Sequence, residues 1–258
     1  MAITLPDTVQ LPTLSQTLTS EVNRRIGRAM HDYSMLDDGD KVMVAVSGGI
    51  DSLVLAWLLL HWQKKAPITY QVLAVHLDMG FGAIEATQVN DQLCRLGINF
   101  HTETTEFGKK ALETENGRSG CYYCARQRRN RLFELAKEKD CNKLALGHHR
   151  EDIIETFFIN LLYGGNLSTM VPRQDLFHGK LSLIRPMAYL DKTDIIDIGS
   201  KLGVRPVKNP CPLSETSKRQ EVRDLMATIY TKDPMIKSTI FSALGNVRKD
   251  YLLKPTSF

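Results

Sequence analysis

The chain has 258 residues, of which 43% are hydrophobic, and its net charge is +4. This length and composition predict a folded α/β protein with a substantial core, and they exclude a disordered chain. The longest apolar run, residues 53–60, is too short to cross a bilayer, and the N-terminal residues do not resemble a secretory signal, so we expect a cytoplasmic protein with no membrane contact.

The predicted elements alternate between helix and strand. Residues 1–16 have no apolar period and suggest a loose arm, and an amphipathic helix over 20–35 follows. The predicted strands cover residues 42–46, 72–77, 98–103, 143–146 and 181–184, and the predicted helices cover 52–65, 83–96, 124–139, 151–163 and 192–202. This order is typical of a doubly wound, mostly parallel sheet, followed by a small C-terminal helical part. Ligands bind such sheets at the C-terminal strand ends.

A glycine turn follows the first predicted strand. Ser47, Gly48, Gly49, Ile50, Asp51 and Ser52 form it, and a helix opens directly afterwards. Backbone N–H groups and the positive end of a helix meet at such a turn, which suits a polyphosphate. The alternative is an ordinary strand-to-helix turn capped by Asp51 and Ser52. The hexapeptide matches SGGxDS, the signature of PP-loop ATP pyrophosphatases, which cleave ATP between the α- and β-phosphates.

Three of the five cysteines lie in turn or loop contexts. Cys121 and Cys124 form a Cys-x-x-Cys pair before an arginine-rich helix, and Cys211 lies between two prolines. Cys94 and Cys141 suit the core as small apolar side chains. Three thiolates allow a zinc site completed by His148 or His149, or a [4Fe–4S] cluster with one open iron. A redox-active pair of thioredoxin type is a further alternative.

Positive charge is concentrated between residues 118 and 131. This segment contains no acidic residue and five arginines, at positions 118, 126, 128, 129 and 131. Such a patch can bind the phosphates of a nucleic acid. A solvated helix face is an equally good interpretation.

These motifs together resemble the TtcA/TtuA family of PP-loop enzymes that thiolate tRNA, and more closely its TtcA branch, which makes 2-thiocytidine. The resemblance extends from about residue 30 to about residue 246. Besides the turn and the cysteines, its carriers are Ala145 to Asp152 (ALGHHRED), Tyr163-Gly164-Gly165, Ile184-Arg185-Pro186 and Pro210-Cys211. The family implies a fold of the adenine nucleotide alpha hydrolase-like type.

The resemblance also implies the chemistry. ATP, with Mg²⁺, would adenylate a pyrimidine C2 carbonyl, that of cytidine in tRNA, and sulfur would replace the oxygen. Cys121, Cys124 and Cys211 would hold a [4Fe–4S] cluster whose free iron carries the sulfur. A cysteine desulfurase or free sulfide would be the sulfur donor, and the protein would be a homodimer. The implied division is an N-terminal arm and helix (1–40), a PP-loop pyrophosphatase domain (41–190) and a C-terminal helical part with the third cysteine (191–258).

Individual roles follow from the matched positions. The catalytic residues would be Asp51, Asp152 and Arg128, where Asp152 binds Mg²⁺ or orients the substrate. Besides the turn, the nucleotide would contact Asp78, Gly147 and His148. Structural interpretations stand beside these: Asp152 could complement the dipole of its own helix, and His148 could be a neutral structural histidine.

The sequence departs from the family in three ways. Ile50 stands where both branches usually have lysine, Ser214 stands where the TtcA branch commonly has a further cysteine, and the zinc fingers of the TtuA branch are missing. Two other functions are therefore kept as alternatives. One is the same adenylating chemistry on a free nucleobase or small metabolite, and the other is a zinc-stabilised nucleotide-binding module without turnover.

Overall fold

The computed structural model describes residues 12–113, 117–208, 211 and 218–253. The chain divides into two compact units, each made of two segments: Met1–Arg150 with Val171–Glu215, and Glu151–Met170 with Thr216–Phe258. These segments alternate along the chain, whereas the segments predicted from the sequence are consecutive.

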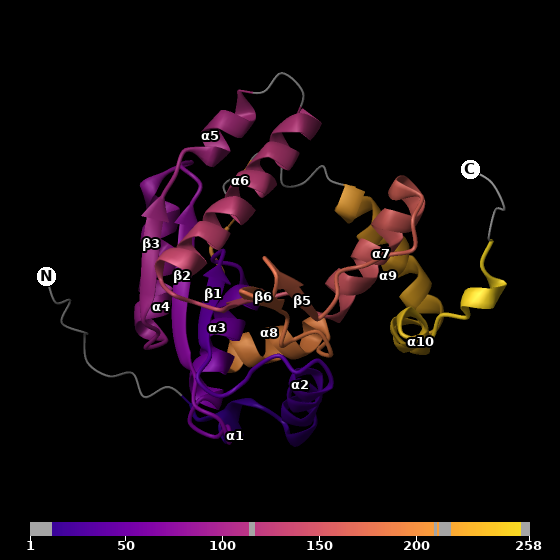
Figure 1. Cartoon of the computed structure of the whole chain (residues 1–258), viewed down its shortest axis with the longest axis horizontal. Coiled ribbons are helices and arrows are strands. Elements are labelled where there is room, and N and C mark those ends of the chain that lie inside the picture. The colour runs from indigo at the N-terminus through magenta and orange to yellow at the C-terminus, as the bar shows by residue number, and fades with distance from the viewer. Residues whose placement is uncertain (1–11, 114–116, 209–210, 212–217, 254–258) are drawn as a thin grey trace, which may run out of the picture. The chain divides into compact units, whose positions relative to one another are not determined.

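A six-stranded sheet forms the centre of the first unit, with the strand order β3-β2-β1-β4-β6-β5 (Figure 1). Its strands are β1 (Lys41–Val46), β2 (Gln71–Asp78), β3 (Phe100–Thr104), β4 (Lys143–Ala145), β5 (Arg173–Leu176) and β6 (Leu181–Ile184). All neighbouring pairs are parallel except β5 and β6. The doubly wound, mostly parallel sheet is confirmed, and the antiparallel edge strand β5 is an addition to the prediction.

Helices surround this sheet. In the first unit they are α1 (Leu14–Thr17), α2 (Ser20–Asp32), α3 (Ile50–Trp62), α4 (Ala83–Arg95), α5 (Phe107–Leu112), α6 (Gly117–Glu138) and α8 (Lys192–Lys201). Part of the predicted N-terminal arm is thus helical, since α1 buries Leu14 and Thr17, while residues 1–11 lie outside the described residues. The prediction for α6 began too late. The helix starts at Gly117 and contains Cys121 as well as Cys124, because contacts with α5 override the weak helix propensity of Gly117 and Gly120.

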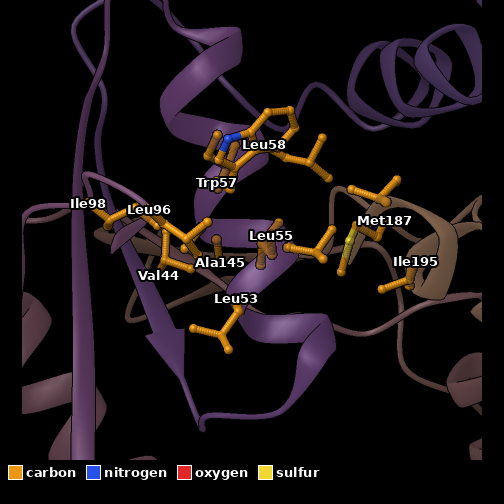
Figure 2. Close-up of a cluster of buried hydrophobic side chains, with 14 of the residues drawn as sticks. Val44, Leu53, Leu55, Trp57, Leu58, Leu96, Ile98, Ala145, Met187 and Ile195 are labelled. Atoms are coloured by element: carbon orange, nitrogen blue, oxygen red, sulfur yellow. The ribbon is translucent and has the colours of Figure 1, made fainter. Parts of the chain in front are cut away.

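Helix α3 carries the glycine turn at its N-terminus and is apolar on every side. Residues 53–59 are all fully or almost fully buried. Figure 2 draws Leu53, Leu55 and Trp57 of α3 in one cluster with Val44 and Ala145 of the sheet and with Ile195 of α8. A helix that is apolar all round needs cover on all faces, and the sheet, α2 and α8 belong to the cluster that provides it. The start of α3 is therefore firmly held.

The second unit is helical. It contains most of α7 (Arg150–Gly164), α9 (Lys218–Lys232), α10 (Met235–Leu244) and the short 3₁₀ helix η1 (Lys249–Tyr251). Its core is formed by Ile154, Val222 and Met226. Beside this core, the buried carboxylate of Glu155 accepts hydrogen bonds of 2.9 and 3.1 Å from the guanidinium of Arg223.

None of the helices in the described ranges is both long and apolar enough to cross a membrane.

Candidate functional site

The glycine turn connects β1 to α3 and is held in shape by its own serines. The backbone N–H of Ser47 donates to Oγ of Ser52 at 3.1 Å, and that hydroxyl donates to the carbonyl of Gly49 at 2.9 Å. Gly48 has a φ of +87°, and a Cβ there would lie 2.7 Å from Cγ2 of Val89. Only glycine fits this position, because both the left-handed backbone and the available space exclude a side chain.

The N-terminus of α3 presents its amide groups at this turn. Gly49 occupies the N-cap position and has no side chain to cap them. The first N–H groups of a helix have no partner within the helix and carry partial positive charge, so they bind anions such as phosphate. This geometry agrees with the polyphosphate-binding interpretation of the turn.

A second loop approaches the turn from β4. A Cβ on Gly147 would lie 3.0 Å from both the carbonyl carbon of Asp51 and the backbone nitrogen of Ser52. These contacts are to backbone, which cannot easily move aside. Gly147 is therefore needed for close packing of the two loops, and the structure places this predicted site residue directly against the glycine turn.

Asp51 and Asp78 both have partners. An oxygen of Asp51 lies 2.5 Å from Nζ of Lys192, a residue that the sequence interpretation did not single out. Asp78 ends β2, and its carboxylate accepts a hydrogen bond from the N–H of Gly80 at 2.9 Å. Asp78 thus shapes its own turn at the C-terminal edge of the sheet. Its predicted contact with a nucleoside stays a prediction.

His76 is a further residue near the turn that no sequence motif indicated. This buried residue lies opposite Val46 in the sheet, and its Nδ1 is 2.9 Å from the carbonyl oxygen of Val46. Burial lowers the pKa of His76, against the raising effects of that hydrogen bond and of Asp78. A polar residue inside an otherwise apolar strand was the signal. His76 fixes the end of β1 immediately before Ser47.

Three thiols gather around α6. Cys121 and Cys124 are one turn apart on this helix, and Cys211 comes from the segment after α8. The pKa of Cys124 is raised, first by burial and then by the negative charges of Cys211 and Cys121, while Arg128 acts in the opposite direction. The structure therefore brings together the three cysteines that the sequence singled out. The neighbours of Cys211, residues 209–210 and 212–217 with Ser214 among them, lie outside the described residues.

The other two cysteines lie apart from this group. Cys141 packs against the second apolar cluster of the sheet, and its Sγ is 3.7 Å from the carbonyl oxygen of Lys139. Cys94 is half-buried in α4. Neither contributes to the electrostatics of Cys124. Both are suitable matched controls for the three grouped cysteines.

The described residues contain no preformed site for a single metal ion. In these ranges, no group of three or more His, Cys, Asp or Glu side chains converges as a metal site does. His148, a candidate zinc ligand, uses its Nδ1 to accept a hydrogen bond from Nε of Arg185 at 3.2 Å. A single zinc ion requires its ligands at one point, whereas each cysteine of an iron–sulfur cluster binds a different iron.

The arginines of α6 fall into two groups. Arg126, Arg128 and Arg129 are exposed, and within the described part of the chain they make no hydrogen bond or ion pair. Arg131 instead contacts three carboxylates, with its closest contact to Glu103 at 2.6 Å and others to Glu134 and Glu138. The predicted basic patch must therefore exclude Arg131. The side chain of Arg118 lies outside the described residues.

The charge of Arg129 acts on a second, buried guanidinium, that of Arg185. Arg185 is buried at the end of β6, and burial together with the charge of Arg129 lowers its pKa to about 10. The motif Ile184-Arg185-Pro186 thus places a guanidinium next to α6. This concentration of positive charge favours an anion nearby.

Asp152 belongs to the second unit. It lies in the first turn of α7, is buried, and has an oxygen 3.5 Å from a guanidinium nitrogen of Arg219. All the other predicted site residues belong to the first unit. The ion pair and the position at a helix N-terminus give Asp152 a structural role within its own unit, and its catalytic role stays a prediction.

The amino-acid sequence matches a known protein family. Residues 18–229 match the family model described as a PP-loop domain. The tRNA-cytidine(32) 2-sulfurtransferase of Geotalea uraniireducens is 34% identical over 93% of this chain and 96% of its own length, and that of Pseudomonas putida is 37% identical over 91% and 86%.

A solved structure agrees in fold. The U34-tRNA thiolase NcsA from Methanococcus maripaludis, determined with its [4Fe–4S] cluster, has a TM-score of 0.69 and covers 91% of this chain and 81% of its own, at 20% identity. This likeness shows that the two chains share the same α/β fold. The chain belongs to the PP-loop family and, within it, to the family of the tRNA-cytidine(32) 2-sulfurtransferases.

Proposed function

We propose that the protein is an ATP-dependent sulfurtransferase that converts a cytidine of tRNA to 2-thiocytidine. The observation that carries this proposal is the presence, in one compact unit, of a glycine turn at a helix N-terminus and a group of three cysteines. The names of the relatives support cytidine in tRNA as the substrate.

The reaction needs ATP because the C2 oxygen of cytidine is a poor leaving group. That oxygen attacks the α-phosphate of ATP, and pyrophosphate leaves. A sulfide then attacks C2, and the oxygen departs with AMP, so ATP, tRNA and sulfide yield thiolated tRNA, AMP and pyrophosphate. The turn from Ser47 to Ser52 holds the pyrophosphate end, and the α-phosphate remains open to attack. Asp51 is positioned in this turn to help hold Mg²⁺.

The cysteines fit a [4Fe–4S] cluster better than zinc. Cys121 and Cys211 lie close enough to Cys124 for their charges to act on it, and three such thiolates can each bind a different iron of one cluster. When bound, such a cluster supplies an iron without a protein thiolate, where the sulfur to be transferred can bind. Burial raises the pKa of the Cys124 thiol, and the charge of Arg128, one turn later in α6, opposes that rise in favour of the thiolate that a metal requires.

We retain two further expectations as part of this proposal. The sulfur comes from a cysteine desulfurase or from free sulfide, and the protein assembles as a homodimer. The proposed roles of the glycine turn and of the three cysteines do not depend on the sulfur donor or on the homodimer.

The proposal is tested with anaerobically purified protein, unmodified tRNA, ATP and sulfide. We expect the tRNA to gain 2-thiocytidine, detected by mass spectrometry of its nucleosides, with AMP and pyrophosphate formed in equal amounts. A colourless protein with stoichiometric zinc and no turnover would favour the zinc-stabilised module, and thiolation of a free nucleobase without tRNA would favour the small-acceptor alternative.

Binding of tRNA distinguishes the two groups of arginines in α6. Arg126→Ala removes an exposed cation without an ion pair in the described residues, so we expect weaker tRNA binding and a salt-dependence slope smaller by about one unit. Arg131→Ala serves as the control. Its charge is already used by Glu103, Glu134 and Glu138, so the slope should not change. An unchanged slope for Arg126→Ala, measured by filter binding at several salt concentrations, would argue against a tRNA contact on this part of α6.

A further inference from the structure

We propose that Lys192 is the phosphate-binding cation of the ATP site, brought to the glycine turn by the N-terminus of α8. This inference rests on the proposed use of ATP. The residue comes from a segment 141 positions later in the sequence than Asp51, and its Nζ lies 2.5 Å from an oxygen of Asp51. The proposed ligand is the pyrophosphate part of ATP, at the β- and γ-phosphates.

The turn alone has the wrong charge for this ligand. Residues 47–52 include the carboxylate of Asp51 and no lysine, arginine or histidine. A polyphosphate carries several negative charges, and Asp51 repels them unless a cation lies close by. The amides at the start of α3 supply only partial charge. Beside any bound Mg²⁺, a full positive charge of the protein itself can reach this ligand only from elsewhere in the fold, and Lys192 is in contact with the turn.

The position of Lys192 in its own helix also points to a role outside that helix. It is the first residue of α8, where the positive end of the helix dipole disfavours a lysine. The capping of α8 is provided by Asp191 and Asp194, which form a capping box. Lys192 therefore does not stabilise α8 through the dipole, and its charge is directed to Asp51.

Two arginines hold this end of α8 in place. Arg25 donates to Asp194 at 2.8 Å, and Arg150 donates to Asp191 at 2.8 Å. Both acidic residues flank Lys192 in sequence and are largely shielded from solvent. The backbone that carries Lys192 is thus fixed from two sides, while 37% of its own side chain is exposed. An ammonium on a fixed backbone and a flexible stem can move from Asp51 to a phosphate oxygen.

The packing of Ile50 on α8 accounts for the position of Lys192 at the turn. A Cβ on Gly199 would lie 2.6 Å from Cδ1 of Ile50, so the isoleucine side chain packs directly on α8. It joins the main apolar cluster instead of carrying charge at the turn. The contact between Ile50 and Gly199 holds α8 against the start of α3, and this packing brings the N-terminus of α8, with Lys192, to the turn.

In this proposal, Lys192 and Asp51 are each other's partners in the free protein, and both change partners when ATP binds. Before nucleotide binds, the two side chains neutralise each other. When Mg²⁺ and ATP bind, Asp51 helps hold the metal and Lys192 turns to the phosphates, so no charge is left without a partner. Lys192 is in this scheme a binding residue, and the adenylation chemistry itself does not pass through it.

The test compares Lys192→Met with Lys201→Met in the full-length protein. Both lysines lie in α8, but Lys201 is at its other end and pairs with Asp197 at 2.7 Å. Titration calorimetry would measure the affinities for ATP, pyrophosphate and AMP. For Lys192→Met we expect roughly 10- to 100-fold weaker binding of ATP and pyrophosphate, as for the loss of a charge-assisted hydrogen bond, and little change for AMP. Lys201→Met should bind all three as the unaltered protein does.

The measured affinities distinguish the loss of a phosphate contact from general damage to the site. Unchanged ATP and pyrophosphate affinity in Lys192→Met would overturn the inference, and so would equal losses for ATP and AMP, which indicate general damage to the site. Lys192→Arg keeps the positive charge and should recover most of the affinity, which separates loss of charge from misfolding. If the unaltered protein binds no ATP, the proposed function itself fails, and that result is distinct from a failure of Lys192 alone.

Discussion

Replacing Cys211 by alanine is expected to abolish both iron binding and the formation of 2-thiocytidine. Cys211 lies near Cys121 and Cys124 although it is far from them in sequence, and its charge raises the pKa of Cys124. Without it only two thiolates remain, too few to hold a [4Fe–4S] cluster. The measurements are iron and acid-labile sulfide per chain after anaerobic reconstitution, and thiolated nucleoside in the tRNA. We expect iron to fall to background and thiolation to fall at least about 100-fold, the scale of losing an essential catalytic group.

The control uses the remaining cysteines. Cys94→Ala and Cys141→Ala remove the same thiol from positions outside the group, and their effect should be limited to packing, about 1 kcal/mol in the free energy of unfolding. Cys121→Ala and Cys124→Ala should behave as Cys211→Ala does. Full iron content in Cys211→Ala together with loss of iron in Cys94→Ala or Cys141→Ala would show that another set of ligands holds the cluster.

Asp51→Ala is expected to abolish the cleavage of ATP to AMP and pyrophosphate while the iron content stays unchanged. The carboxylate lies in the glycine turn, next to backbone that packs on Gly147, and it balances the charge of Lys192. Its loss removes the proposed contact with Mg²⁺, and a decrease of about 10²- to 10³-fold in turnover is the scale for one such electrostatic group. The assay separates ATP, ADP and AMP by chromatography during tRNA thiolation.

Asp197→Ala is the matched control for Asp51→Ala. Asp197 also pairs with a lysine of α8, but it does so at an exposed position away from the turn, so ATP cleavage should be unaffected. Loss of iron in Asp51→Ala would mean that the cysteine group depends on the glycine turn for its cluster. Formation of ADP and orthophosphate as the main products in the unaltered protein would contradict the assignment of cleavage between the α- and β-phosphates.

The sheet was predictable because its central strands are short, apolar runs flanked by turns. β1 and β4 show this pattern plainly, and such buried runs are typical of parallel sheets. The strand β5 was missed because its sequence, Arg-Gln-Asp-Leu, is mostly polar, as an edge strand can be. The early start of α6 was missed because propensity weighs against Gly117 and Gly120, and only tertiary contacts decide the matter.

The candidate site was predictable where its residues are close in sequence. The glycine turn and the Cys-x-x-Cys pair are local motifs, and the structure places both in the first unit. The partnership of Lys192 with Asp51 has no local pattern, since it depends on how α8 packs against α3. The ion pair between Arg131 and Glu103 was not predicted for the same reason, because that glutamate belongs to a different element, β3.

The burial of residues 53–59 of α3 has a consequence for motion. This part of the helix has no solvent-facing side and cannot detach by a local opening, so we expect its amide hydrogens to exchange only when the unit unfolds. The turn at its N-terminus is held in shape by the internal hydrogen bonds of Ser47 and Ser52. We therefore expect the proposed binding of pyrophosphate at this turn to cost little backbone entropy, with the main adjustment in side chains such as that of Lys192.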